Sequence, residues 1–222
     1  MPILRVTDPG NVRGSASVAS AMIFELRHRL IFLRHGETDW NAEGRLQGGQ
    51  DIPLNAKGRA QAEEAGRIVG KILGRDKARI DACDHVCSPL GRARMTMELA
   101  RGALGLDPKA YRLEDRLREM SFGRWEGMTW PEVQKDDPLA ARNRELDKWG
   151  LVPPGGESYA MLCDRLAPWL ETISTETIAV AHGGVARCLM YMLAGTATER
   201  APMSDIWQGR VLVFEAGKYR WI

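Results

Sequence analysis

The sequence predicts an α/β fold in which short buried strands alternate with amphipathic helices. Two apolar runs, Leu30–Leu33 and Thr177–Ala181, have the length of strands buried on both faces, and a histidine with a following glycine comes soon after each. Segments with helical spacing lie between them, and residues 211–222 form an apparent hairpin that would add an antiparallel strand at the sheet edge. Ligands bind at the carboxyl ends of strands in such sheets, so His35 and His182 are candidate site residues.

Composition indicates one globular domain. The chain has 222 residues, of which 44% are hydrophobic and 27% are charged, which is enough for one large core. Residues 1–21 lack the continuous apolar core of a secretory signal. We expect a flexible N-terminal extension over residues 1–24 and a single domain over residues 25–222. The alternatives are that residues 1–21 form a weak organelle-type presequence, or that translation begins at Met22.

Charge and cysteine content predict the setting. A formal net charge of +2 is too small to indicate nucleic acid or a membrane surface as the partner. No apolar stretch approaches the roughly 20 residues needed to span a bilayer. The four cysteines lack the spacing of a disulfide framework, so we expect a cytoplasmic protein. Cys83, His85 and Cys87 alternate as metal ligands on one strand face could, but no fourth ligand is evident, and we expect no metal site.

The first half of the chain predicts a loop, a helix, a strand and a second helix. Residues 41–55 are rich in glycine and read as a loop above the first strand, in which Arg45 and Gln47 can both reach an anion. Gln47 and Gly48 are candidate substrate-binding residues. Apolar spacing predicts a helix over residues 58–73 and a strand over residues 80–87. Ser88 then reads as the N-cap of the next helix, with Pro89 at its first position. Arg92 would lie in its first turn, where free N–H groups favour an anion.

The second half predicts the remaining helices. Residues 111–127 are dense in charge but end among aromatic residues, so Glu119 is expected to lie against Phe122 or Trp125. Residues 131–154 predict short helical pieces that cover one side of the sheet. Two further helices, over residues 159–173 and 185–193, have the apolar spacing of core elements.

Five side chains, placed around one pocket, suit phosphoryl transfer. Arg34 and Arg92 offer planar cations that match phosphate oxygens, and their charge lowers the pKa of a nearby histidine. A neutral His35 could attack phosphorus and divide one displacement into two steps. Glu119 would donate a proton to the leaving oxygen and later accept one from water. His182 would complete the phosphate pocket.

The chain resembles the histidine phosphatase superfamily, also called the phosphoglycerate mutase-like family, from about residue 30 to the last helix. The motifs that carry the resemblance are, in chain order, Leu33-Arg34-His35-Gly36-Glu37-Thr38, Trp40-Asn41, Gly44-Arg45, Asp51 with Pro53-Leu54, Ser88-Pro89-Leu90 with Arg92-Ala93, Glu119 with Gly123 and Trp125-Glu126-Gly127, residues 154–158, and Ala181-His182-Gly183-Gly184. One departure is Gly49, where many members carry a bulky residue, so a wall of the substrate site is missing or supplied elsewhere.

This resemblance implies a three-layer α/β/α sandwich with a mostly parallel central sheet. It implies that His35 is the phosphorylated nucleophile, that Glu119 is the proton donor, and that Arg34, Arg92 and His182 form the phosphate pocket. Asn41 is implied as a further pocket ligand, and Gly183 as a donor through its backbone N–H.

The expected function is hydrolysis of a phosphomonoester on a small phosphorylated metabolite, through a phosphohistidine and without a cofactor. One alternative is a phosphoglycerate mutase, which needs the same five side chains and would use 2,3-bisphosphoglycerate. A non-catalytic phosphate-binding module has no need of Glu119 as a proton donor. A dinucleotide-binding oxidoreductase lacks its glycine-rich turn after the first strand. A homodimer is compatible with the sequence.

Overall fold

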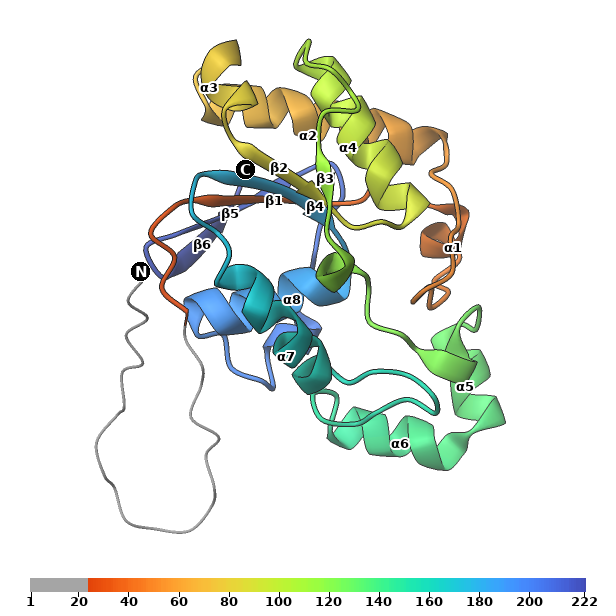
Figure 1. Ribbon diagram of the computed structural model, residues 1–222. Coiled ribbons are helices and arrows are strands. Elements are labelled where there is room, and N and C mark those ends of the chain that lie inside the picture. The colour runs from red at the N-terminus through yellow and green to blue at the C-terminus, as the bar shows by residue number, and fades with distance from the viewer. Residues whose placement is uncertain (1–23) are drawn as a thin grey trace, which may run out of the picture.

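A six-stranded mixed sheet forms the centre of the computed structural model, which describes residues 24–222 (Figure 1). The strand order is β3-β2-β4-β1-β5-β6. The strands are β1 (Leu30–Arg34), β2 (Asp84–Cys87), β3 (Arg112–Leu113), β4 (Thr177–Ala181), β5 (Val211–Glu215) and β6 (Lys218–Trp221). Strands β3, β2, β4 and β1 are parallel, whereas β5 runs antiparallel to β1 and forms a hairpin with β6. The predicted hairpin is therefore confirmed, and its reversed strand lies one position inside the edge.

Helices cover both faces of the sheet, as a three-layer sandwich requires (Figure 1). Helices α2 (Ala56–Ile72) and α4 (Gly91–Ala103) pack on one face, and α7 (Tyr159–Leu170) and α8 (Gly183–Ala194) pack on the other. Alternate residues of β1 enter the two cores: Ile31 and Leu33 face α2 and α4, whereas Leu30 and Phe32 face α7 and α8. All four are fully buried, which explains why β1 reads as an unbroken apolar run.

The region before β2 differs from the prediction. Residues 80–87 were expected to form one strand, but Ile80 belongs to the short helix α3 (Lys77–Asp81), and β2 begins at Asp84. The Asp76 side chain accepts from Arg79 N and caps α3, so the local capping signal outweighs the apolar run.

The start of α4 also differs. Its N-cap is Leu90 rather than Ser88, and the Leu90 side chain makes no capping hydrogen bond. Instead, Asp51 Oδ1 from the loop after α1 (Asp39–Ala42) accepts from Gly91 N at 2.8 Å. Arg92 still lies in the first turn of α4, as predicted.

The expected helical pieces of residues 131–154 are α5 (Trp130–Asp136) and α6 (Pro138–Leu146). They do not cover the sheet. They form a small separate core, in which Val133 and Ala141 pack with Trp125, and Figure 1 shows them beyond α7, away from the sheet. The prediction that this region lies over one side of the sheet was therefore wrong.

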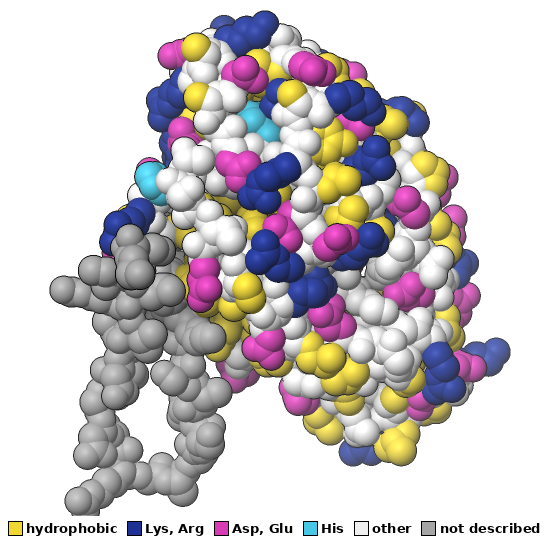
Figure 2. Space-filling view, in the orientation of Figure 1, with side chains coloured by type: hydrophobic (Ala, Val, Ile, Leu, Met, Phe, Trp, Pro, Cys, Tyr) yellow, Lys and Arg dark blue, Asp and Glu magenta, His cyan; other side chains and the backbone are white. Residues whose placement is uncertain are grey.

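The predicted extension, residues 1–24, lies outside the described residues except for Phe24. Phe24 is buried in the core beneath α7 and α8, and its N–H donates to Met192 O at 2.8 Å. Within residues 24–222, no helix has both the length and the apolar character needed to cross a bilayer. Acidic and basic side chains are interspersed over the face seen in Figure 2, in keeping with the small net charge.

Candidate active site

His35 and His182 follow two neighbouring parallel strands. Arg34, the last residue of β1, pairs with Ala181, the last residue of β4, and His35 N donates to Ala181 O at 2.9 Å. This register brings the two imidazole rings to a centroid separation of 5.2 Å, with an interplanar angle of 58°. The sequence-based expectation that both histidines meet at one edge of the sheet is confirmed.

The His35 imidazole is neutral and has a defined tautomer. Burial lowers its pKa well below the usual range, and the positive charges of Arg92 and Arg34 lower it further. His35 Nδ1 lies 2.8 Å from Gly36 O, which can only accept a hydrogen bond. Nδ1 therefore carries the proton, and the lone pair is on Nε2, as a nucleophile requires.

His182 is oriented by Ser88, a residue that sequence analysis assigned to helix capping. His182 Nε2 lies 2.7 Å from Ser88 Oγ, while the N–H of Leu90 donates to the same oxygen at 3.4 Å. The Ser88 hydroxyl can donate its hydrogen to Nε2, and in that arrangement the proton of a neutral His182 is on Nδ1. Nδ1 is buried and has no hydrogen-bond partner among the described residues, so in that tautomer it is a donor available to a ligand.

Arg34 and Arg92 supply positive charge at the same edge. Arg34 Nη1 donates to Ile206 O at 2.7 Å, and Arg92 donates to the carbonyls of Gly48 and Gln50. The Nε atoms of both arginines are buried and have no hydrogen-bond partner within residues 24–222. Burial lowers the pKa of Arg34 to about 10, with a further contribution from the charge of Arg187. Two desolvated guanidinium groups with free donors favour the arrival of an anion.

Glu119 is held by the N-terminus of α8. Gly184 N donates to both carboxylate oxygens of Glu119, each at 3.1 Å, and Met120 N donates to Oε1 at 3.0 Å. Trp125, which was expected to lie against Glu119, packs instead with Val133 and Ala141. The charge of Glu119 acts on both Arg34 and Arg92, so the carboxylate belongs to the same site.

Three of the predicted substrate contacts lie in α1 and the loop that follows it. Asn41 Oδ1 accepts from Thr38 N at 3.2 Å, and Gln47 Nε2 donates to Thr38 Oγ1 at 2.7 Å. Gly48 has a positive φ of 53°, and its carbonyl accepts from Arg92 Nη2 at 2.8 Å. Their described contacts hold the loop against the arginine, and their contact with a substrate stays a prediction.

Gly183 opens α8 next to the arginines. A Cβ placed on Gly183 would lie 3.4 Å from Arg187 Nη1 and 3.7 Å from Arg34 Nε. The backbone of Gly183 and the two guanidinium groups therefore lie close together. Gly183 is buried at the first position of α8, where its N–H has no partner within the helix. That N–H is a candidate donor to phosphate, as the resemblance implies.

Sequence reasoning missed three residues that shape the site: Ser88, Arg187 and Gln208. Gln208 Nε2 donates to His35 O at 3.2 Å and to Asn41 Oδ1 at 3.0 Å, and so joins the two segments. Arg187 lies one turn after Gly183 on α8. Its helical spacing from the glycine was the available signal, whereas no local pattern marks Gln208, which lies in a loop.

Within residues 24–222, no group of three or more His, Cys, Asp and Glu side chains is arranged to hold a metal ion. Cys83 Sγ instead donates to Arg79 O at 3.4 Å, and His85 Nε2 lies 2.8 Å from Ile80 O. Both side chains therefore form hydrogen bonds with nearby backbone carbonyls.

Comparison with known proteins agrees with this geometry. A family model described as "Histidine phosphatase superfamily (branch 1)" matches residues 30–222. An acid phosphatase of Mycobacterium tuberculosis is 34% identical over 73% of this chain and 74% of its own length. A 2,3-bisphosphoglycerate-dependent phosphoglycerate mutase of Beijerinckia indica is 30% identical over 83% of this chain and 90% of its own. The crystal structure of a phosphoglycerate mutase from Thermus thermophilus superposes with a TM-score of 0.63 at 33% identity, covering 83% of this chain and 91% of that one.

Proposed function

From the premise that this chain belongs to branch 1 of the histidine phosphatase superfamily, we propose that it is a phosphomonoester hydrolase. It acts through a phosphohistidine on a small phosphorylated metabolite. The observation that carries the proposal is the state of His35, a neutral imidazole with its lone pair on Nε2, placed beside His182 and two desolvated arginines. Relatives named as phosphatases support the same reaction class.

Substrate binding uses the donors that lack a protein partner. The Nε atoms of Arg34 and Arg92 and the Nδ1 atom of His182 are buried and unpaired, so a phosphate dianion would satisfy them together. The ionic contacts also offset the cost of burying two guanidinium groups.

The reaction proceeds in two steps, phosphorylation of His35 and hydrolysis of the phosphohistidine. In the first, His35 Nε2 forms a bond to phosphorus, the bond to the leaving oxygen breaks, and Glu119 gives that oxygen a proton. In the second, water attacks phosphorus, the carboxylate of Glu119 accepts the proton of the water, and the bond to Nε2 breaks to release phosphate. Arg34, Arg92 and His182 stabilise the charge of the phosphoryl group in both steps.

We propose that the chain's own cations serve this reaction without a metal ion or a cofactor. The expected result is that hydrolysis of para-nitrophenyl phosphate is unchanged by EDTA and by added magnesium. Loss of activity in EDTA that a divalent metal restores would contradict this part of the proposal.

Phosphoglycerate mutase activity is the second candidate, because relatives and a solved structure bear that name. Phosphate release from a panel of phosphomonoesters, run beside conversion of 3-phosphoglycerate to 2-phosphoglycerate with 2,3-bisphosphoglycerate present, separates the two. We expect hydrolysis of several esters without isomerisation. Isomerisation that depends on the bisphosphate, with little phosphate release, would overturn the proposal in favour of the mutase.

A further inference from the structure

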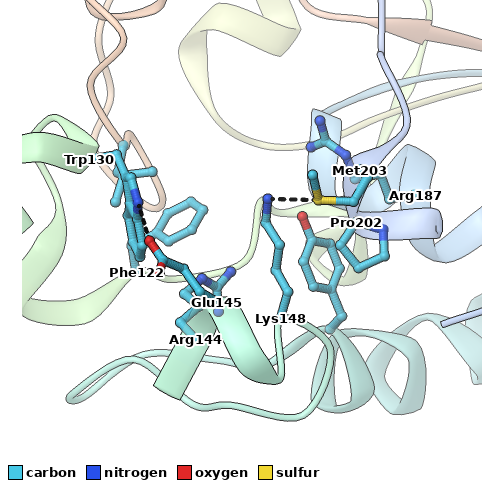
Figure 3. A pocket seen from close by; sticks show the side chains of 10 residues that line it. Phe122, Trp130, Arg144, Glu145, Lys148, Arg187, Pro202 and Met203 are labelled. Atoms are coloured by element: carbon cyan, nitrogen blue, oxygen red, sulfur yellow. Dashed lines mark hydrogen bonds between the residues drawn. The ribbon is translucent and has the colours of Figure 1, made fainter. Parts of the chain in front are cut away.

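A pocket of about 370 Å³ lies between the α5–α6 region and the start of α8 (Figure 3). Its volume has room for the organic part of an ester in addition to a phosphate. One wall is aromatic and includes Phe122, Trp130 and Tyr159. Three cations also line it, namely Arg144, Lys148 and Arg187, with Glu145 as the one carboxylate.

The carboxylate does not neutralise these cations. Glu145 Oε1 accepts from Trp130 Nε1 at 3.2 Å and from Gln134 Nε2 at 2.9 Å. Among the ion pairs of residues 24–222, none includes Arg144, Lys148 or Arg187. The pocket therefore has an excess of positive charge.

Arg144 makes its contacts with other groups of the protein. Its guanidinium carbon lies 5.7 Å from the ring centroid of Phe122 and 6.0 Å from that of Tyr159, and Nη1 donates to Leu151 O at 3.3 Å. The buried guanidinium thus supports the aromatic wall. Because Arg144 is occupied in this way, Lys148 and Arg187 are the two cations of the pocket that are available to a ligand.

Lys148 extends into the pocket toward Met203 and Arg187 (Figure 3). The described contact of its ammonium group is with Met203 Sδ at 3.4 Å, a weak acceptor for a cation. Burial lowers the pKa of Lys148, and the nearby charges of Arg187 and Arg144 lower it further. An acidic ligand would stabilise the charged ammonium group against both its burial and the neighbouring positive charges.

Arg187 connects the pocket with the phosphate site. Its Nε donates to Ser204 O at 3.1 Å, while Nη1 lies close to Gly183, at the point that Arg34 Nε also approaches. Gly184, the residue after Gly183, donates its backbone N–H to Glu119. Through Arg187, the pocket therefore adjoins the start of α8, where Arg34 and the proposed proton donor also lie.

We propose that this pocket binds the leaving group of the substrate, and that the leaving group carries a second acidic group held by Lys148 and Arg187. The assignment rests on the proposed hydrolysis of phosphomonoesters and specifies its substrate class. A carboxylate and a second phosphate share the required chemistry, since each accepts charge-assisted hydrogen bonds from both cations. The aromatic wall favours a flat or apolar body between the two acidic groups.

The test compares matched esters. The first is para-(carboxymethyl)phenyl phosphate and the second is its amide, para-(carbamoylmethyl)phenyl phosphate, which has nearly the same shape without the charge. We expect kcat/KM to be at least about tenfold higher for the acid, as for a charge-assisted hydrogen bond. The para-(phosphonomethyl)phenyl ester distinguishes the two sources of charge. A kcat/KM above that of the carboxymethyl ester indicates that the pocket binds a second phosphate, and a kcat/KM below it indicates a carboxylate.

The variant Lys148→Met should reduce the preference for the acid to near unity, and Arg187→Met should reduce it as well. Arg142→Met, which removes an exposed charge from helix α6, outside the pocket, should retain it. Equal kcat/KM for the acid and the amide in the unmodified protein, or a full preference in Lys148→Met, would overturn the assignment.

A binding measurement separates this assignment from the proposed function. Calorimetry of the same two esters with His35→Ala gives the ratio of their Kd values without turnover. If no ester is hydrolysed, the proposed function fails, but a Kd preference that Lys148→Met abolishes still supports the pocket. Equal Kd values for the acid and the amide would overturn the pocket whatever the turnover.

Discussion

Gly184 donates its backbone N–H to both carboxylate oxygens of Glu119, each at 3.1 Å. This contact places Glu119, the proposed proton donor, at the N-terminus of α8; Gly184 follows His182 and Gly183 directly. One short segment therefore supplies the imidazole proposed to bind phosphate, a candidate N–H donor to phosphate, and the anchor of the carboxylate. Several consequences of this arrangement can be measured.

Replacing Glu119 with glutamine should impair the reaction in proportion to how much the leaving group needs a proton. For alkyl phosphates we expect kcat to fall by roughly 10²–10⁴-fold, as for loss of a general acid. For para-nitrophenyl phosphate the fall in the phosphorylation step should be much smaller, because nitrophenolate leaves without protonation. Single-turnover rates for the two esters give this comparison, and equal losses would contradict the assigned role.

Adding a methyl group at Gly184 should displace Glu119. A Cβ at this position would lie 2.4 Å from Glu119 Oε1 and 3.3 Å from Met120 Cγ, so the carboxylate must move. We expect Gly184→Ala to reproduce the leaving-group dependence of Glu119→Gln. Gly102→Ala is the matched control, because a Cβ there meets nothing within 4 Å. A Gly184→Ala variant with unaltered rates on alkyl phosphates would show that the contact is not required.

Removing the Ser88 hydroxyl should affect His182. Without the hydrogen bond at 2.7 Å, the tautomer and the orientation of the ring are no longer fixed. Since such a bond contributes about 1 kcal/mol, Ser88→Ala should lower kcat/KM by on the order of fivefold or more. Thr172→Ala, which removes a hydroxyl bonded to Trp169 O, serves as the control. The NMR signals of the His182 ring should report the tautomer change directly, and an unchanged spectrum would argue against this role.

The two active-site histidines should make the protein less stable in acid. Burial and the charges of Arg92 and Arg34 lower the pKa of both well below the ordinary value of 6.5, so the folded protein keeps them neutral. Below about pH 6.5 the unfolded chain binds a proton at each histidine, and the folded chain does not. The free energy of unfolding should therefore fall with decreasing pH, by up to about 1.4 kcal/mol per pH unit for each histidine.

Urea unfolding between about pH 7.5 and pH 5 measures this effect. The double variant with His35→Asn and His182→Asn should show a shallower dependence than the unmodified protein. Buried His85, whose pKa is also lowered, stays in both proteins, so the difference isolates the site. His28→Asn removes an exposed histidine and should keep the full dependence. An identical pH dependence in the double variant would contradict the buried neutral state.

Local sequence patterns were sufficient where one element determines the position of a residue. His35 and His182 each follow a strand, and the apolar runs before them predict both the strands and their binding edge. Arg92 was predicted from its place in the first turn of a helix, although the capping residue was wrongly assigned. Ser88 was misread because its hydroxyl, which accepts from Leu90 N, also contacts His182, 94 positions along the chain.

Other features depend on tertiary contacts that no short pattern shows. Strand β3 has two exposed residues, Arg112 and Leu113, and therefore lacks the alternation of a half-buried strand. Gln208 reaches His35 and Asn41 from a loop near the end of the chain. The anchoring of Glu119 by Gly184 likewise depends on how α8 meets a distant loop.

The measurement that tests the central claim most directly is the trapping of a phosphorylated protein in a rapid-quench experiment with a good leaving group. We expect stoichiometric phosphorylation that is stable in alkali and labile in acid, and that peptide mapping locates on His35. His35→Ala should neither form this species nor turn over substrate, while it keeps the circular dichroism spectrum of the unmodified protein. Substantial hydrolysis by His35→Ala, or single-turnover hydrolysis without any phosphorylated His35, would contradict the proposed mechanism.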